Sequence, residues 1–147
     1  MSSLLIKKGK LVTSAGSSIS DILVIDGRIV SIDHDIAESK AERVIDAGSK
    51  YVFPGGIDPH VHLHLPAASG FSSDDFLTGS RAALYGGTTA LIDFVTPRRG
   101  QTLAEALSLR KAEAKSSLTD YSFHVSPVEW TNNTEQEIIN CIDEGMT

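Results

Sequence analysis

Three of the chain's five histidines occupy alternate positions in one short segment, PGGIDPHVHLHLP, at residues 54–66. They are His60, His62 and His64, and Asp58 continues the same spacing toward the N-terminus. Side chains two residues apart on a strand share a face, so this spacing predicts that the four polar side chains point one way. Imidazole nitrogen suits zinc and the neighbouring transition metals. The segment is therefore a candidate metal site.

A bare His-x-His is weak evidence by itself, because histidines also occupy the solvent-facing sides of strands. Side chains with this spacing lie roughly 6.5–7 Å apart along the strand, and their rings can lean onto one metal ion or onto two ions about 3.5–4 Å apart. The alternate positions here are apolar, and a loop with Pro66 and Gly70 follows. Ligands of parallel β/α folds bind at the carboxyl ends of strands, so this setting favours the metal site.

The sequence pattern changes near Pro54. Residues 1–53 alternate with a period of two between turn signals, which is typical of strands. Asp26-Gly27 lies between two β-branched runs and predicts a hairpin, and another strand pair is expected around Gly48. This half is therefore predicted to be a small all-β module.

Residues 54–147 instead alternate between strand and helix patterns. Ser72 or Ser73 is the expected N-cap of the first helix, and Thr102 and Glu105 have the spacing of a capping box at the start of the second. Repeated β-α units build parallel sheets, either open or closed into a barrel. The predicted strands cover residues 57–65, 88–95 and 120–127, the predicted helices lie within residues 72–87, 102–115 and 132–145, and a fourth strand is expected to begin at Met146-Thr147.

Composition narrows the class of protein. The formal net charge of −6 and the scattered basic residues argue against a nucleic-acid or anionic-membrane partner, and the short run Lys7-Lys8-Gly9-Lys10 is expected to be a solvated strand edge or turn. Cys141 is the only cysteine, so an internal disulfide is excluded, and its apolar helical surroundings predict a buried core residue. The lack of a secretory or membrane-spanning pattern predicts a soluble, cytoplasmic protein.

The run FPGGIDPHVHLHLP, followed in order by SSDDF, AALYGGTTALIDFVTP and DYSFHVSPVEW, resembles the dihydropyrimidinase and hydantoinase family of the amidohydrolase superfamily. The resemblance implies an α/β fold, the beginning of a (β/α)8 TIM-type barrel preceded by part of a small β-sandwich domain. Residues 1–53 would be the N-terminal part of the sandwich, and residues 54–147 the first three β-α units of the barrel. A complete barrel takes about 250 residues, so the resemblance is to an N-terminal portion.

The same resemblance implies an activity for the full-length parent. Members of the family hydrolyse the ring amide of dihydropyrimidines or hydantoins at a centre with two zinc ions. The parent is therefore expected to be a zinc-dependent cyclic amidohydrolase, acting on C–N bonds other than peptide bonds in a small-molecule substrate. It is also expected to be a homo-oligomer, either a tetramer or a dimer.

By the resemblance, His60 and His62 correspond to the metal-binding His-x-His of the first barrel strand. His64 stands where the family more often has an amide or an acid, and it is a candidate either for lining the substrate pocket or for an ordinary rim histidine. Asp93 and His124 match no metal ligand of the family. They are candidates for groups that orient ligands, with satisfied polar groups in the barrel layers as the alternative.

The family's remaining groups are a carboxylated lysine on the fourth strand, two later histidines and a late aspartate that acts as the base. The lysine is expected beyond residue 147, so no catalytic residue is expected in this chain and these residues alone are expected to be inactive. The alternatives are another cyclic amidohydrolase, such as allantoinase, and a non-catalytic dihydropyrimidinase-like scaffold protein without stoichiometric zinc. The presence of His60 and His62 favours the enzyme over the scaffold.

Overall fold

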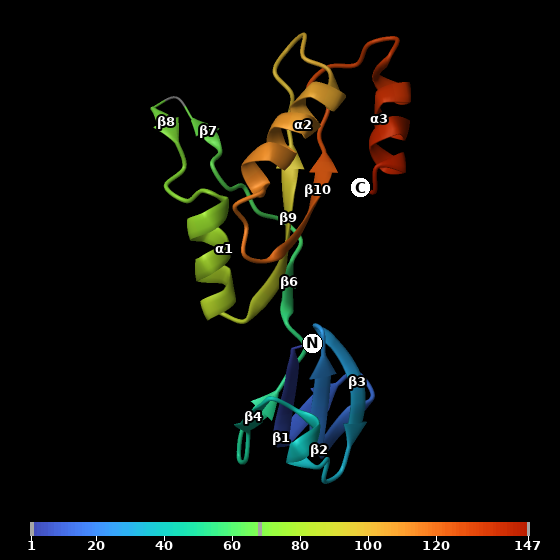
Figure 1. Cartoon of the computed structure of the whole chain (residues 1–147). Coiled ribbons are helices and arrows are strands. Elements are labelled where there is room, and N and C mark those ends of the chain that lie inside the picture. Colours follow the sequence, from blue (N-terminus) through green and yellow to red (C-terminus); the bar gives the residue numbers. More distant parts are fainter. Residues whose placement is uncertain (1, 68, 147) are drawn as a thin grey trace. The chain divides into compact units, whose positions relative to one another are not determined.

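The computed structural model describes residues 2–67 and 69–146, which divide into two compact units on either side of the Pro54–Gly55 bond. The first unit is built on one sheet with the strand order β3-β2-β1-β4, and β5 also pairs with β1 (Figure 1). Over residues 2–54, the helical structure is limited to one turn of 3-10 helix, as the sequence predicted for an all-β module. Its elements are β1 (Ser3–Thr13), β2 (Gly16–Ile25), β3 (Arg28–Asp33), the 3-10 turn (Glu38–Lys40), β4 (Arg43–Asp46) and β5 (Tyr51–Val52).

The predicted Asp26-Gly27 hairpin is confirmed. β2 and β3 run antiparallel, with Ile25 opposite Arg28 at the turn. Asp26 has φ +48° and Gly27 has φ +77°, so both central residues adopt the left-handed conformation that a two-residue type I′ turn requires. Asp26 and Gly27 alone determine this turn, so it could be predicted from local sequence.

The strand pair expected around Gly48 takes a different form. Both strands exist, but β4 and β5 do not pair with each other; each runs parallel to β1, one beyond the other along the same edge. The connection between them is held by hydrogen bonds from Ala47 N to Lys7 O (2.8 Å) and from Lys10 N to Lys50 O (2.9 Å). The open edge of β1 therefore outcompetes a local hairpin.

Lys7 is the exception to the prediction of a solvated basic run. Its side chain is buried, with Nζ 3.5 Å from Asp21 Oδ2 and 3.4 Å from Asp35 Oδ1, and it donates to the carbonyl of Ile36 at 3.0 Å. Burial alone would lower the pKa of Lys7, but the hydrogen bond to Asp35 and the charge of Asp21 outweigh it and raise that pKa. The carboxylates arrive from β2 and from the segment after β3, which local sequence around Lys7 does not reveal.

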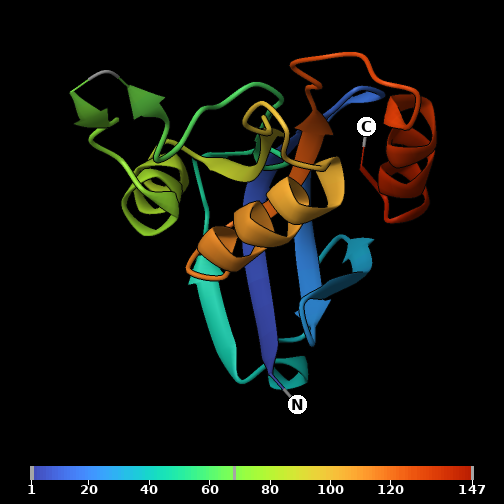
Figure 2. The ribbon, with the colours of Figure 1, turned by 90° about the horizontal axis from the view of Figure 1, so that it is seen from above.

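The second unit is mixed α/β, as predicted. Its main sheet is parallel, with the order β10-β9-β6, and α1 and α2 pack on β9 while α3 packs on α2. Figures 1 and 2 both show α2 lying between α1 and α3. The elements are β6 (Gly56–Asp58), β7 (Pro66–Ala67), β8 (Gly70–Phe71), α1 (Phe76–Tyr85), β9 (Thr88–Val95), α2 (Leu103–Ala114), β10 (Asp120–Val125) and α3 (Thr134–Asp143).

The helix caps test the sequence predictions at single residues. The Thr102–Glu105 capping box of α2 is confirmed, but α1 begins after Asp75 and not after Ser72 or Ser73. Asp75 accepts from the Thr78 N–H at 2.8 Å, and the Thr78 hydroxyl accepts from the Asp75 N–H at 3.1 Å. The Ser72 hydroxyl is engaged elsewhere, since it accepts from the backbone N–H of Leu65.

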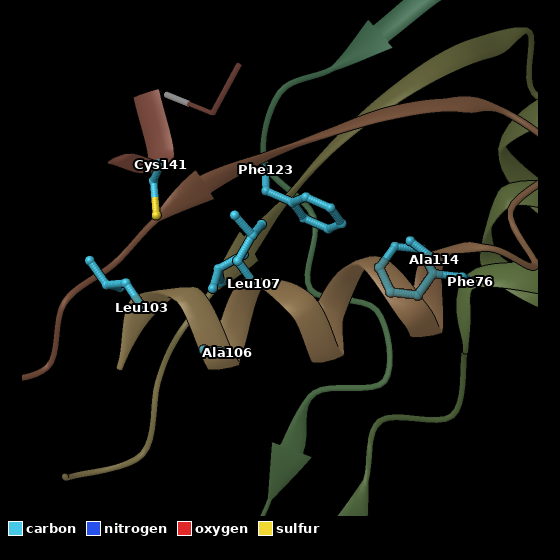
Figure 3. Close-up of a cluster of buried hydrophobic side chains, with 8 residues drawn as sticks. Phe76, Leu103, Ala106, Leu107, Ala114, Phe123 and Cys141 are labelled. Carbon is cyan, nitrogen blue, oxygen red and sulfur yellow. The ribbon is translucent and has the colours of Figure 1, made fainter. Parts of the chain in front are cut away.

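A single apolar cluster joins α1, α2 and α3 to the parallel sheet (Figure 3). Cys141 is 2% exposed within it, so the prediction of a core cysteine is confirmed, and burial raises the pKa of its thiol. Met146 packs against the cluster but lies outside any strand, while Thr147, the rest of the predicted fourth strand, lies outside the described residues. The buried members are Phe76, Val95, Leu103, Ala106, Leu107, Ala114, Phe123 and Cys141.

Candidate metal centre

The histidine segment leaves the strand earlier than the spacing predicts. β6 ends at Asp58, whereas a strand was expected over residues 57–65. Pro59 has no N–H for the strand ladder, although Val61 N still donates to Ile92 O of β9 at 3.0 Å. The histidines therefore follow the carboxyl end of a parallel strand on an irregular backbone, and they do not lie on the strand itself.

His60 and His62 lie together in this segment. Their Nε2 atoms are 3.2 Å apart and their ring centroids are 5.0 Å apart, with the ring planes at 81°. The ring of Phe94, from β9, contacts both imidazoles, with centroid distances of 4.6 Å to His60 and 4.8 Å to His62. Both histidines remain exposed.

The separation of the two nitrogens suits a shared metal ion. Zinc binds imidazole nitrogen at about 2.0–2.1 Å in tetrahedral geometry, which places two nitrogen ligands of one ion about 3.3–3.4 Å apart. The observed separation of 3.2 Å is close to that value. Over residues 2–67 and 69–146, no group of three or more His, Cys, Asp or Glu side chains gathers into a metal site.

His124, the third histidine near a strand end, supports the segment from β10. It donates from Nε2 to the carbonyl of Pro59 at 3.1 Å, one residue before His60, and its ring lies 5.1 Å from that of Phe94. Phe94 and His124 are opposite each other in the parallel register of β9 and β10. Both therefore stand on the same side of the sheet as the two histidines.

His64 does not join the other histidines, so the predicted common face of Asp58, His60, His62 and His64 is wrong. The backbone of His64 turns into the left-handed region, with φ +48°. Its ring stacks on Phe71 at 4.0 Å, and its Nδ1 lies 3.6 Å from Glu113 Oε1. It instead lines an open hollow of about 470 Å³, which Phe71, Phe94 and Arg110 also border.

Asp93 lies on the opposite face of β9 from Phe94. Leu91, Asp93 and Val95 alternate as buried residues on the side that packs against the helices. The Asp93 carboxylate is fully buried, and it accepts from the backbone N–H of Leu63 at 2.8 Å and from that of Phe94 at 2.5 Å. It touches neither imidazole.

Arg110 completes this arrangement and was missed in the sequence. Its Nη2 donates to Asp93 Oδ1 at 2.8 Å and to the carbonyl oxygen of Leu63. The available signal was its position on α2, because residue 110 follows the buried Ala106 by four and the buried Leu107 by three. A charged residue in line with an apolar stripe indicates a buried partner.

Several curated relatives match almost the whole chain. A D-hydantoinase from Geobacillus stearothermophilus is 43% identical over 146 residues, and a dihydropyrimidinase from Rattus norvegicus is 39% identical over 140 residues. The chain belongs to the hydantoinase and dihydropyrimidinase family. The resemblance carried by the His-x-His segment and its flanking motifs is therefore confirmed.

Solved structures of hydantoinases have the same fold over this length. A crystal structure of D-hydantoinase superposes on 99% of the chain with a TM-score of 0.93 and 39% sequence identity. The chain spans 31% of the length of the Geobacillus protein and 27% of that of the rat protein, in keeping with the predicted N-terminal portion. A scan against protein-family models finds no match. No helix in the described part of the chain is long and apolar enough to span a membrane.

Proposed function

We propose that the full-length protein hydrolyses a cyclic amide, opening a dihydropyrimidine or hydantoin ring in a zinc-dependent reaction. The observation that carries the proposal is the 3.2 Å separation of His60 Nε2 and His62 Nε2, which is close to that of two nitrogen ligands of one tetrahedral ion. The relatives named D-hydantoinase and dihydropyrimidinase indicate the substrate class. Zinc, and not calcium or magnesium, suits a site built from imidazole.

Each residue of the site has a distinct role in this proposal. His60 and His62 hold one metal, and Phe94 packs beside both rings and limits the directions in which they can turn. His124 holds the carbonyl of Pro59 and so fixes the start of the histidine segment. A bound zinc supplies Lewis-acid polarisation of the amide carbonyl and activates water.

The remaining parts of the centre are expected beyond residue 147. These are a carboxylated lysine that bridges two zinc ions, further histidines and an acid that takes the proton. With only two neutral ligands, these 147 residues would bind zinc weakly and would lack a base, so they are expected to be inactive alone.

The fold supports the same proposal at a coarser level. β6, β9 and β10 are neighbours in a parallel sheet, and α1 and α2 form the connections between them. This is the order that the first units of a (β/α)8 barrel require, with the first unit of the chain as part of a β-sandwich. We further propose a cytoplasmic homo-oligomer, either a tetramer or a dimer, with neither nucleic-acid nor membrane partners.

The test compares the full-length protein with three variants, His60→Ala, His62→Ala and the control His34→Ala, which changes an exposed histidine of the first unit. Ring opening of dihydrouracil and of hydantoin is measured with and without a chelator, together with zinc content. The proposal expects zinc-dependent turnover that either site substitution abolishes and the control retains. A folded full-length protein without zinc or turnover would contradict it and favour the scaffold. Turnover by the 147 residues alone would contradict the expectation that the remaining metal ligands and the base lie beyond residue 147.

A further inference from the structure

The two candidate ligands lie on an irregular backbone after the end of β6. The hydrogen bond from Val61 N to Ile92 O holds this backbone to β9 at one point, and further contacts must fix the rest of it. We propose that Asp93 and Arg110 form a clamp on the Leu63 peptide groups that positions His62 for metal binding. This inference rests on the proposed function, because it concerns the same metal. Asp93 and Arg110 are positioning residues in it, since neither touches an imidazole.

The clamp binds both backbone polar groups of Leu63, its N–H and its carbonyl. Leu63 N donates to Asp93 Oδ2 at 2.8 Å, and the Leu63 carbonyl accepts from Arg110 Nη2, which also donates to Asp93 Oδ1 at 2.8 Å. The Leu63 N–H belongs to the peptide group that joins His62 to Leu63. Its bond to Asp93 therefore fixes the main-chain orientation of His62, from which the imidazole projects.

The clamp is itself held from several sides. The Asp93 side chain is 1% exposed and the Arg110 side chain 12%. The Arg110 guanidinium lies 4.7 Å from the ring centroid of Phe76, and its Nη1 donates to Glu113 Oε2 at 2.5 Å. Charge-assisted hydrogen bonds of this kind are stronger and more directional than neutral ones.

In making these contacts, the guanidinium of Arg110 leaves one of its own N–H groups without a hydrogen bond to any described residue. Its Nε is buried without a hydrogen-bond partner in the part of the chain that the structure describes. A buried donor without a partner is unfavourable and is found in few places in native structures. The orientation that leaves Nε unpaired is the one that lets Nη2 reach Leu63 and Asp93 together.

The two faces of β9 contact different parts of the site. Phe94 lies against the imidazoles, whereas Asp93 points to the helix side, and the Phe94 N–H donates to Asp93 at 2.5 Å. Asp93 thus accepts from the backbone N–H of Leu63, which follows His62, and from that of Phe94, whose ring contacts both imidazoles. Groups that hydrogen-bond directly to metal ligands change metal affinity by about 10–100-fold when they are replaced, and we expect an effect of that order from the backbone contacts at Leu63.

The test uses three substitutions in the full-length protein, each chosen for what it leaves in place. Arg110→Met keeps the apolar stem and removes every donor, while Arg110→Lys retains a cation that can reach part of the clamp. Asp93→Asn keeps one oxygen for Arg110 and Phe94 but turns an amide NH₂ toward the Leu63 N–H, so donor faces donor. Zinc affinity is measured by competition with a coloured chelator, and the cobalt-substituted protein gives the absorption spectrum of the site.

Leu103→Ala is the matched control, because it opens a cavity in the cluster on the same helix and Leu103 is 2% exposed. We expect Arg110→Met and Asp93→Asn to weaken zinc binding by about 10–100-fold and to change the cobalt spectrum. Arg110→Lys should recover part of both effects. Leu103→Ala should lower the unfolding temperature while leaving affinity and spectrum near those of the unchanged protein.

The outcomes separate the clamp from the metal site. Loss of zinc affinity in His60→Ala and His62→Ala, without loss in folded Arg110→Met or Asp93→Asn, would overturn the clamp and leave the proposed function standing. Unchanged zinc affinity in the two histidine variants would overturn the proposed function itself. If Arg110→Met does not fold, the clamp is tested with Asp93→Asn and Arg110→Lys. A loss of zinc affinity in these two variants no greater than that in Leu103→Ala would overturn the clamp.

Discussion

Leu63 packs directly over Gly79 of α1. A β-carbon on residue 79 would lie 2.4 Å from Leu63 Cδ2 and 3.3 Å from Leu63 Cδ1. Leu63 cannot withdraw freely, because its side chain packs against the apolar cluster and both of its backbone polar groups are hydrogen-bonded. Because Gly79 has no side chain, the surface of α1 has room there for Leu63, the residue that follows His62.

This contact predicts that Gly79→Ala destabilises the protein. Replacing a glycine by alanine in a helix ordinarily stabilises by about 1 kcal/mol, but inserting a methyl group into a packed site costs roughly 1–3 kcal/mol. We expect a net loss of up to about 2 kcal/mol. In the Leu63→Ala background the same change should stabilise by about 1 kcal/mol. A double-mutant cycle by urea unfolding measures both, and equal effects in the two backgrounds would refute the contact.

The hairpin of the first unit offers a second test. Gly27 has φ +77°, a conformation that costs an L-amino acid about 1–2 kcal/mol. Gly27→Ala should therefore lower the free energy of unfolding of this unit by roughly that amount. Asp26→Asn is the control, since asparagine also accepts the left-handed conformation, and it should stay within about 0.5 kcal/mol. Chemical denaturation of both variants checks the prediction.

The buried pair of Lys7 and Asp21 predicts a dependence on pH. Burial by itself would raise the pKa of Asp21, but hydrogen bonds from the N–H groups of Lys8 and Ile36, and the charge of Lys7, lower it below its ordinary 3.8. A carboxyl with a lowered folded-state pKa stabilises the fold above its unfolded pKa, and the effect disappears as pH falls through the lower folded value.

The corresponding experiment compares Asp21→Asn with the unchanged protein. The variant should be less stable at neutral pH, and the difference in free energy of unfolding should shrink as pH falls below about 4. Glu42→Gln, which changes an exposed acid of the same unit, serves as the control. A difference that stays constant between pH 7 and pH 3 would show that the charge of Asp21 has no part in it.

The features that were predicted correctly from sequence depend on residues close together in the chain. The Asp26-Gly27 turn and the Thr102–Glu105 capping box are each complete within a few residues. The pairing of His60 with His62 is also local, although the backbone that produces it is not the expected strand. Short-range hydrogen bonding was enough for the turn and the cap, whereas the two imidazoles lie together on a backbone that the strand spacing did not predict.

The features that were missed depend on partners far along the chain. Lys7 is buried because carboxylates from elsewhere in its unit surround it. Arg110 contacts Leu63, 47 positions earlier. The apolar stripe of α2 indicates that Arg110 has a buried partner, but the residues adjacent to Lys7 and Arg110 do not identify which residues these partners are.

Gly55 provides the last test, because it lies just before the strand that leads to the histidines. A β-carbon at residue 55 would lie 2.1 Å from Thr89 Oγ1 and 2.4 Å from Thr89 Cγ2. Gly55→Ala would therefore push β6 away from β9 at the start of their parallel pairing, where Gly56 lies opposite Thr88.

We expect Gly55→Ala to cost roughly 1–3 kcal/mol of stability, as overpacking does. Thr89→Ala should not rescue it, because the Thr89 Cβ would still lie 2.7 Å from the added carbon. Thr89→Gly should rescue most of the loss, apart from the destabilising effect of glycine within a strand. Urea unfolding of the two single variants and the two double variants distinguishes these cases. Full rescue by Thr89→Ala would contradict the close approach of the two backbones and leave only the threonine side chain as the obstacle.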